Sequence, residues 1–202
     1  MVRPARLLLP PAGRILFAMP RIVYSVAASL DGFIAGPNGE YDWIVHDTSY
    51  DFAALWDRFD TILMGRLTFQ VALTRFNPIE KMGKKVVVVS TTLDPAQYPG
   101  ATVLRADFAP HLARMKKEKG RDIWLMGGGA LFRAVLDAGL IDSIEVSVMP
   151  VLLGSGVPLI PPGANCRLIL EECNTSPLGI LHTRYSLAPP VPSERKSRSR
   201  RV

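Results

Sequence analysis

The apolar residues along the chain predict a series of short strands, the first beginning at residue 21. Each strand is an apolar or β-branched run bounded by glycine, proline or polar turn residues. The run KVVVVS at residues 85–90 is unbroken, as expected for a strand that is covered on both faces. The predicted strands span residues 21–29, 60–64, 85–90, 123–126 and 143–149, followed by two more near 166–172 and 179–187.

Helical spacing of apolar residues predicts helices between these strands. Residues at i, i+3, i+4 and i+7 lie on one face of a helix, and the first such set is Phe52, Leu55, Trp56 and Phe59. Thr48, with Asp51 three residues later, predicts a capping box at the start of that helix. Further helices are predicted over residues 67–74, over about 109–119, and over an apolar stripe that ends at Gly139, namely Leu131, Phe132, Val135 and Leu136.

Strands alternate with helices up to residue 138, and the rest of the chain is mostly strand. This order predicts an α/β fold with a largely parallel sheet and an antiparallel edge. Ligands of such sheets bind beyond the carboxyl ends of the parallel strands. We therefore look for candidate chemistry at those strand ends.

Length and charge define the folded body. The 202 residues are about the length of one domain, and no apolar run approaches the ~18 residues of a membrane-spanning helix. The net charge of +6 comes from the ends, because residues 1–18 and 191–202 together carry +7 and residues 19–190 carry about −1. We expect residues 1–18 to be a disordered or non-native extension, with either Met1 or Met19 as the true start. Residues 19–190 would form one domain, and residues 191–202 a disordered basic tail. A membrane partner is excluded, and nucleic acid is not favoured.

The cysteine and histidine residues do not predict a metal site. Cys166 and Cys173 are too few for a disulfide framework or a four-cysteine zinc site. The three histidines lie in different segments, without the spacing of metal ligands. The composition fits a reducing cytoplasm.

Glycine and hydroxyl residues follow three of the predicted strands. A strand that passes through Gly127-Gly128-Gly129 into a helix leaves free backbone N–H groups at the helix N-terminus, where the dipole favours an anion. Tight packing of strand on helix would explain the same glycines. The segment Gly65-Arg66-Leu67-Thr68 repeats the arrangement, and its guanidinium suits phosphate. The alternative for Arg66 is an ordinary surface arginine at the start of a helix. Ser90 ends a third predicted strand and Thr91 follows it, so both would add donors there, although Thr91-Thr92 could equally be an ordinary turn. Two phosphate sites, one of them with an arginine, fit a dinucleotide that carries an extra 2′-phosphate.

Five segments of the sequence together resemble those of a known superfamily. Segments that carry the resemblance are SLDGFIAG (29–36), MGRLTF (64–69), VVVVSTT (86–92), MGGGALF (126–132) and GLIDSIEVSVMPVLLGSGVPLI (139–160). Their order and spacing resemble the dihydrofolate-reductase-like superfamily, in particular its stand-alone relatives of the reductase domain of riboflavin biosynthesis. The resemblance covers about residues 20–187. It implies a three-layer α/β/α fold around a mixed, mainly parallel sheet, with NADPH bound at the carboxyl ends of the strands.

The resemblance also implies roles for single residues. Arg66 would take the 2′-phosphate, flanked by Ser90 and Thr91, while Ala27 and Ile34 would lie beside the nicotinamide. A cis peptide bond is implied at Gly127–Gly128 or Gly128–Gly129. The remaining residues of the implied cofactor site are Gly65, Leu67 and Thr68 around the adenosine phosphates, and Gly128, Gly129, Ala130, Leu131 and Phe132 facing the pyrophosphate.

A carboxylate on the first helix anchors the substrate in dihydrofolate reductases. By this resemblance Asp51 is the catalytic candidate, with Leu55 and Ser147 as substrate-binding residues. Asp51 also has the structural alternative of the capping box, and Asp47 is a second candidate. Met126 occupies the position at which riboflavin-pathway reductases carry an acidic residue, immediately before the glycines.

These observations predict an NADPH-dependent reductase that transfers a hydride to a small heterocyclic or conjugated substrate. One alternative is a reductase of dihydrofolate or of the ribosylated pyrimidine of riboflavin biosynthesis. Another is a nucleotide-binding module without turnover. We expect a cytoplasmic homodimer, as is common among such relatives, with the Gly/Pro-rich segment 30–47 as a lid.

Overall fold

The computed structural model describes residues 19–163 and 165–189, and within them the chain alternates strands and helices as the sequence predicts. The two termini beyond these residues, for which tails were predicted, lie outside the described part. The strands are β1 (Ile22–Ser29), β2 (Phe33–Ala35), β3 (Phe59–Gly65), β4 (Lys85–Val89), β5 (Ala101–Leu104), β6 (Asp122–Gly127), β7 (Ser143–Met149), β8 (Val157–Pro158), β9 (Leu168–Thr175) and β10 (Leu181–Leu187). The helices are α1 (Phe52–Asp57), α2 (Arg66–Arg75), α3 (Phe108–Met115) and α4 (Gly129–Asp137), with 3₁₀ turns η1 (Ile79–Met82) and η2 (Pro95–Gln97).

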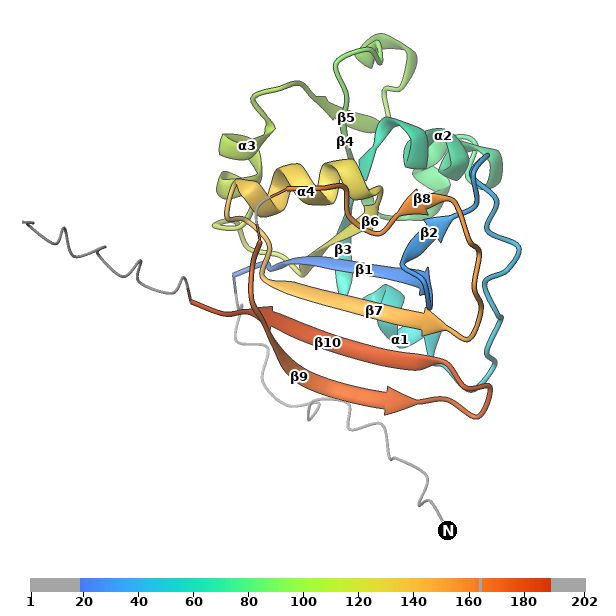
Figure 1. Cartoon of the computed structure of the whole chain (residues 1–202). Helices are drawn as coiled ribbons and strands as arrows, with labels where there is room; N and C mark the ends of the chain where they lie inside the picture. The colour runs from blue at the N-terminus through green and yellow to red at the C-terminus, as the bar shows by residue number, and fades with distance from the viewer. Residues whose placement is uncertain (1–18, 164, 190–202) are drawn as a thin grey trace, which may run out of the picture.

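Eight of these strands form one mixed sheet, in the order β5-β4-β3-β6-β1-β7-β10-β9 (Figure 1). The pairs from β5 through β7 are parallel, whereas β10 is antiparallel to both β7 and β9. Strands β2 and β8 make a separate antiparallel pair. The predicted α/β fold, with a mainly parallel sheet and an antiparallel edge, is confirmed.

Helices cover both faces of the sheet and complete three layers. Alternate residues of a strand point to opposite faces, so in β3 Ile62 and Met64 pack with α1 and α2, while Leu63 packs with α3 and α4. On the second face the ring of Phe132 stacks on Tyr24, with ring centroids 3.8 Å apart. Burial of both strand faces explains the continuous β-branched run in β4.

Several element boundaries differ from the prediction. The helix expected to continue to Phe59 ends at Asp57, because Phe59 is already the first residue of β3 and is fully buried. Its N-cap is Asp51 itself, whose carboxylate accepts a 2.8 Å hydrogen bond from the Ala54 N–H. The capping box starting at Thr48 is therefore wrong.

Other differences concern short or poorly patterned segments. Strand β5, with four residues, and the β2–β8 pair, with three and two, were missed because they are too short for a periodic signal. Helix α3 ends four residues earlier than predicted, at Met115, and β9 begins and ends two to three residues later than predicted. None of the described helices is long and apolar enough to cross a membrane.

Candidate functional site

The three strand ends singled out in the sequence meet at one edge of the sheet. Strand β3 lies between β4 and β6, and all three run parallel. Gly65, the last residue of β3, pairs with Val89 of β4, and the preceding Met64 pairs with Gly127 of β6. The glycine turns and Ser90 therefore lie along a common rim beyond the carboxyl ends, which is where ligands bind in such sheets.

The two glycine turns lie close to each other. A methyl group placed on Gly65 would lie 4.0 Å from the backbone nitrogen of Gly128, and one on Gly127 would lie 3.5 Å from Oγ1 of Thr68. Gly127 has a φ of +146°, a conformation that favours glycine. The peptide bond Gly127–Gly128 is cis, one of the two positions that the family resemblance implied.

Each turn leads into a helix whose first N–H groups have no side-chain cap. Gly65 is the N-cap of α2 and Gly128 is the N-cap of α4, and neither helix start has a side-chain capping hydrogen bond. Backbone N–H groups at such ends are oriented to donate to an anion, and the helix dipole favours negative charge there. Two helix N-termini side by side suit a pyrophosphate together with a further phosphate.

Arginine and hydroxyl groups lie beside this rim. Arg66 is exposed and donates a 3.1 Å hydrogen bond from its guanidinium to Oε1 of Gln70, one turn along α2. Ser90 is buried, and its hydroxyl accepts hydrogen bonds from the N–H groups of Thr92 and Leu93, so it holds the turn in which Thr91 stands.

Arg105 is a rim residue that the sequence reasoning missed. It follows the end of β5 directly and donates a hydrogen bond to the carbonyl of Thr91. It was missed because β5 was not predicted. The only signal was the short β-prone run Ala101–Leu104 after Pro99-Gly100.

The helix that follows the glycine triplet contributes its backbone to the rim and its side chains to the core. Leu131 and Phe132 are 7% and 3% exposed and pack in the core. The N–H of Phe132 donates to the carbonyl of Gly128, so only the N–H of Leu131 and the exposed Ala130 can face a ligand. A methyl group on Gly129 would lie 2.7 Å from the carbonyl oxygen of Pro158. Packing alone thus requires glycine at position 129, whereas at position 128 the nearest atom would be an ordinary 3.8 Å away.

The expected nicotinamide end lies at the carboxyl end of β1. Ala27 is half-buried in β1, and Ile34, in β2, is packed against the core on the α4 side. Asp31 joins the loop after β1 to the loop after β7, since its carboxylate accepts hydrogen bonds from the N–H groups of Leu153 and Gly154 and from the Ser29 hydroxyl. These hydrogen bonds, above all the one from Ser29, lower the pKa of Asp31.

A polar cluster lies on the α1 face of the sheet, next to Ala27. Oγ of Ser147 in β7 is 2.9 Å from Nδ1 of His182 in β10. The ring of Tyr50 stacks on His182 with centroids 4.8 Å apart. Burial lowers the pKa of His182, and the nearby carboxylate of Asp47 acts in the opposite direction. This cluster contains one predicted substrate residue, Ser147, and a histidine to which the sequence assigned no role.

The other predicted substrate-site residues have structural roles. Asp51 is exposed and caps α1, and Leu55 of the same helix is 8% exposed and packs in the core. Arg58, the C-cap of α1, forms two hydrogen bonds of 2.9 and 2.7 Å with Glu145 of β7. This ion pair fixes α1 over the strand that carries Ser147.

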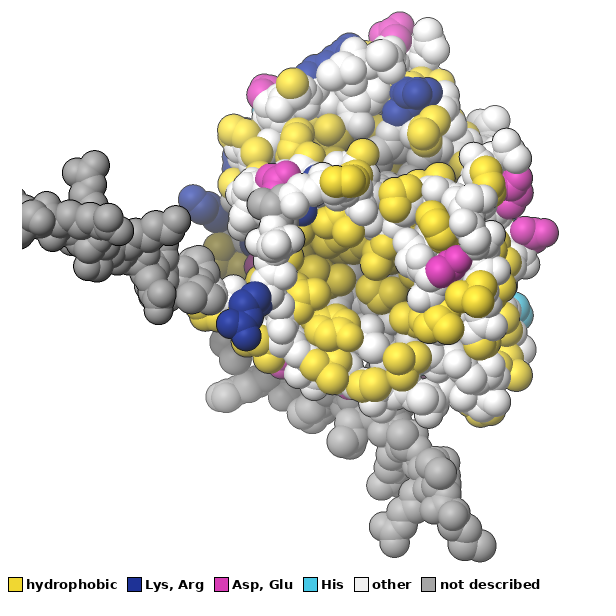
Figure 2. Space-filling model, viewed as in Figure 1, with side chains coloured by type: hydrophobic (Ala, Val, Ile, Leu, Met, Phe, Trp, Pro, Cys, Tyr) yellow, Lys and Arg dark blue, Asp and Glu magenta, His cyan; other side chains and the backbone are white. Residues whose placement is uncertain are grey.

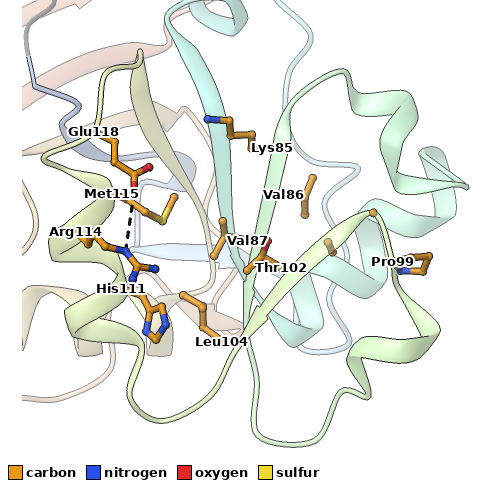
Figure 3. A pocket seen from close by; sticks show the side chains of 12 residues that line it. Lys85, Val86, Val87, Pro99, Thr102, Leu104, His111, Arg114, Met115 and Glu118 are labelled. Atoms are coloured by element: carbon orange, nitrogen blue, oxygen red, sulfur yellow. Dashed lines mark ion pairs between the residues drawn. The ribbon is translucent and has the colours of Figure 1, made fainter.

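A pocket of about 300 Å³ lies elsewhere, between β4, β5 and α3 (Figure 3). Its walls include Lys85, at the start of β4, and His111 and Arg114 of α3, with Arg114 paired to Glu118. None of the candidate residues of the rim or the polar cluster lines it. Among residues 19–163 and 165–189, no group of three His, Cys, Asp or Glu side chains could hold a metal ion.

The sheet order, the helices on both faces and the glycine turns at the carboxyl ends of the strands define an α/β protein of the dihydrofolate-reductase-like type. The RibD C-terminal domain model matches residues 20–181, and the chain belongs to this family.

Similar proteins agree with this assignment. YyaP of Bacillus subtilis (strain 168), whose function is uncharacterized, is 35% identical over 166 residues, which cover 77% of this chain and 87% of YyaP. A protein from Shewanella sp. PV-4 assigned to riboflavin biosynthesis has a similar structure, with a TM-score of 0.72 and 27% identity over 85% of this chain and all of that one. Dihydrofolate reductase of Enterococcus faecalis, complexed with NADP(H), shares the fold at a TM-score of 0.60 and 17% identity, covering 85% of this chain and 98% of that one.

Proposed function

We propose that the chain is an NADPH-dependent reductase that transfers a hydride to a small heterocyclic or conjugated acceptor. One observation carries the proposal. Two uncapped helix N-termini, each preceded by a glycine turn, lie close together at adjacent strand ends, and two arginines lie along the same rim. The family assignment supports a reductase-type fold.

The residues of the rim fit the phosphates of such a dinucleotide. The N–H groups at the start of α4 would hold the pyrophosphate, because Gly128 lets it approach the backbone. Those at the start of α2, with the guanidinium of Arg66, would hold the 2′-phosphate, and Arg105 adds a second positive charge beside Thr91. Bound NADPH would supply a hydride close to Ala27, and the chain's part is to orient the acceptor and to deliver a proton.

Isothermal titration calorimetry tests the cofactor. We expect NADPH to bind more tightly than NADH. The Arg66→Ala substitution should reduce the affinity for NADPH and leave the affinity for NADH unchanged, since only NADPH carries the 2′-phosphate. Equal affinity for both cofactors, unaffected by Arg66→Ala, would contradict the assignment of the phosphate site.

Assays with two acceptors separate the alternatives. Dihydrofolate and the ribosylated pyrimidine of riboflavin biosynthesis are the substrates to try first. Met126, in place of the acidic residue before the glycines, favours an acceptor other than the ribosylated pyrimidine. Tight NADPH binding without oxidation by any acceptor would instead support the nucleotide-binding module. Cytoplasmic location and a homodimer remain part of the proposal.

A further inference from the structure

Three residues form a straight row across neighbouring strands on the α1 face of the sheet. Ala27 of β1 pairs with Ser147 of β7, and Ser147 pairs with His182 of β10. Residues directly opposite each other on paired strands point to the same face, and adjacent strands are about 4.8 Å apart. Ser147 thus stands between the residue expected beside the nicotinamide and a histidine.

The row is joined by a hydrogen bond and is within reach of water. Oγ of Ser147 lies 2.9 Å from Nδ1 of His182, and all three residues are half-buried. A protonated imidazole would donate this hydrogen bond from Nδ1, which leaves the serine hydroxyl proton free to point toward a neighbour. The half-buried His182 can then exchange protons with solvent, while Ser147 lies directly opposite Ala27 on the neighbouring strand.

Besides Ser147, side chains from two other segments surround His182. The segment before α1 supplies the stacked ring of Tyr50 and the carboxylate of Asp47, and β9 supplies Asn174, which pairs with His182. Oδ1 of Asp47 accepts hydrogen bonds from Ser49, and hydrogen bonds with Ser49 and Ser176 lower the pKa of Asp47. The next row of the same face carries charged groups that are paired with one another, Glu145 with Arg58 and Arg184 with Glu172.

We propose that Ser147 donates the proton that completes reduction of the acceptor, and that His182 resupplies it through their hydrogen bond. The inference rests on the proposed function, because it needs an acceptor bound over Ala27. It assigns a role to a histidine that the sequence left without one, and it makes Ser147 the catalytic residue of the substrate side.

The step balances for an acceptor with a C=N bond. The carbon takes a hydride from NADPH, which is oxidised to NADP⁺, and the nitrogen takes the hydroxyl proton of Ser147. The serine oxygen takes the Nδ1 proton of the His182 imidazolium as its own O–H bond breaks, so that the serine ends neutral. The imidazole, now neutral, regains a proton from water.

Single-turnover oxidation of bound NADPH, followed from pH 5 to pH 9, tests the relay. The probes are dihydrofolate and the ribosylated pyrimidine of riboflavin biosynthesis. For the wild type we expect a plateau at low pH and a fall of about tenfold per pH unit above the pKa of His182. Ser147→Ala and His182→Asn should lose about 10²-fold in rate at low pH, with a flat pH profile and unchanged NADPH affinity.

Matched variants separate chemistry from folding. Ser147→Thr keeps the hydroxyl and should restore the rate and the pH profile, and added imidazole should partly rescue His182→Ala. His111→Asn, which changes a histidine of α3 outside the site, should behave as wild type. Thermal unfolding identifies any variant that fails to fold, and the conclusion then rests on Ser147→Thr and on the Asp47 variant described next.

The pKa of His182, which can be measured without turnover, should be linked to the pH profile of the rate. Asp47→Asn removes the carboxylate that opposes the lowering of the His182 pKa. It should therefore lower the pKa of the His182 imidazole, measured by NMR titration of the protein, and shift the pH profile of the rate by the same amount. If the pKa of His182 changes and the pH profile of the rate does not shift with it, the relay is overturned and the reductase proposal stays intact. Absence of NADPH oxidation by the wild type with either probe would overturn both the relay and the reductase proposal for these acceptors.

Discussion

A methyl group on Gly65 would lie 4.0 Å from the backbone nitrogen of Gly128, so the turns at the ends of β3 and β6 share one narrow space. This closeness supports two phosphate contacts on one coenzyme. Backbone N–H groups of the two turns would make these contacts, so adding the smallest side chain to either turn tests them.

Gly65→Ala should weaken cofactor binding without unfolding the protein. The backbone of Gly65 is extended, with φ −79° and ψ 165°, which alanine adopts readily. The added methyl would meet Leu131 Cβ at an ordinary 3.8 Å but would occupy the space between the turns. We expect NADPH affinity, measured by calorimetry, to fall by about tenfold or more, and stability to change by only about 0.5 kcal/mol.

The contrasting variant is Gly129→Ala. Its methyl would lie 2.7 Å from the carbonyl oxygen of Pro158 and 3.0 Å from that of Leu159, and both are backbone atoms. Thermal unfolding should show a loss of about 1–3 kcal/mol. If Gly65→Ala binds NADPH with wild-type affinity, the proposal that phosphate binds between the two turns is wrong.

Arg105→Ala tests whether the second rim arginine takes part in phosphate binding. Arg105 donates to the Thr91 carbonyl and follows the end of β5, next to the turn that Ser90 holds. Loss of one charge-assisted hydrogen bond, worth about 1.5–3 kcal/mol, should reduce NADPH affinity about 10- to 100-fold. NADH affinity should stay the same, as determined by calorimetry with both cofactors.

Arg66→Ala provides the comparison. If both arginines hold the 2′-phosphate, the single variants should each reduce the preference for NADPH, and the double variant should abolish it. An effect of Arg66 alone would leave Arg105 as a structural support of the Thr91 turn.

The sequence predicted the elements whose pattern is strong. The unbroken β-branched run of β4 and the apolar stripe of α4 each lie in the predicted element, because burial on two faces or on one stripe leaves a clear period. Three strand ends were predicted to meet, and the parallel register of β3, β4 and β6 brings them together.

The sequence could not predict features that depend on tertiary contact. Arg105 became a candidate only when β5, four residues long, was placed beside β4. His182 lies 35 positions from Ser147 and meets it only through the antiparallel register of β7 and β10. The first helix ends at Asp57 and not at the predicted Phe59, because Phe59 is buried in β3. Each of these follows from packing, which a local pattern does not contain.

Asp51 variants separate its capping role from the catalytic role that the resemblance implies. Asp51→Ala removes the side chain that accepts the Ala54 N–H, and we expect a loss of about 1 kcal/mol in the free energy of unfolding. Asp51→Ser keeps a capping oxygen and should restore most of this stability, as measured by urea denaturation.

Turnover of the same two variants then tests catalysis. Loss of NADPH oxidation in a stable Asp51→Ser protein would show that the carboxylate itself is needed. Wild-type turnover in Asp51→Ser would leave Asp51 as a helix cap only.

Asp31 should make stability depend on pH in the acid range. Hydrogen bonds from Ser29, Gly154 and Leu153 favour its charged form and lower its pKa in the folded state. Its stabilising contribution is therefore fully present above the ordinary aspartate pKa of about 3.9 and is lost as the pH falls through the lower folded-state pKa.

Asp31→Asn should accordingly be less stable than the wild type at pH 7 and should approach it in strong acid. Thermal midpoints measured from pH 7 down to pH 2 give the difference, with the exposed Asp57→Asn as a control for loss of charge alone. A stability difference between wild type and Asp31→Asn that is constant over this range would show that the loops after β1 and β7 are joined by other contacts.

The exposed side chains of the edge strand β9 indicate which surface the expected homodimer would use. Leu168 and Leu170 are 41% and 54% exposed and stand opposite Leu187 and Tyr185 of β10. Apolar side chains gather on this side of the molecule below α4 (Figure 2), and none of the described helices covers the sheet there. An exposed apolar face next to a free strand edge is typical of an interface.

We expect sedimentation of the wild type as a dimer at micromolar concentration, through burial of this face against the same face of a second copy. Leu170→Lys places a charge in that interface and should yield monomers. Ile169→Lys is the matched control, because Ile169 is 48% exposed but pairs with Ser186 and so points to the opposite face of the sheet. If both lysine variants dissociate equally, the strand edge rather than the apolar face carries the contact. A wild type that sediments as a monomer would leave no homodimer to explain.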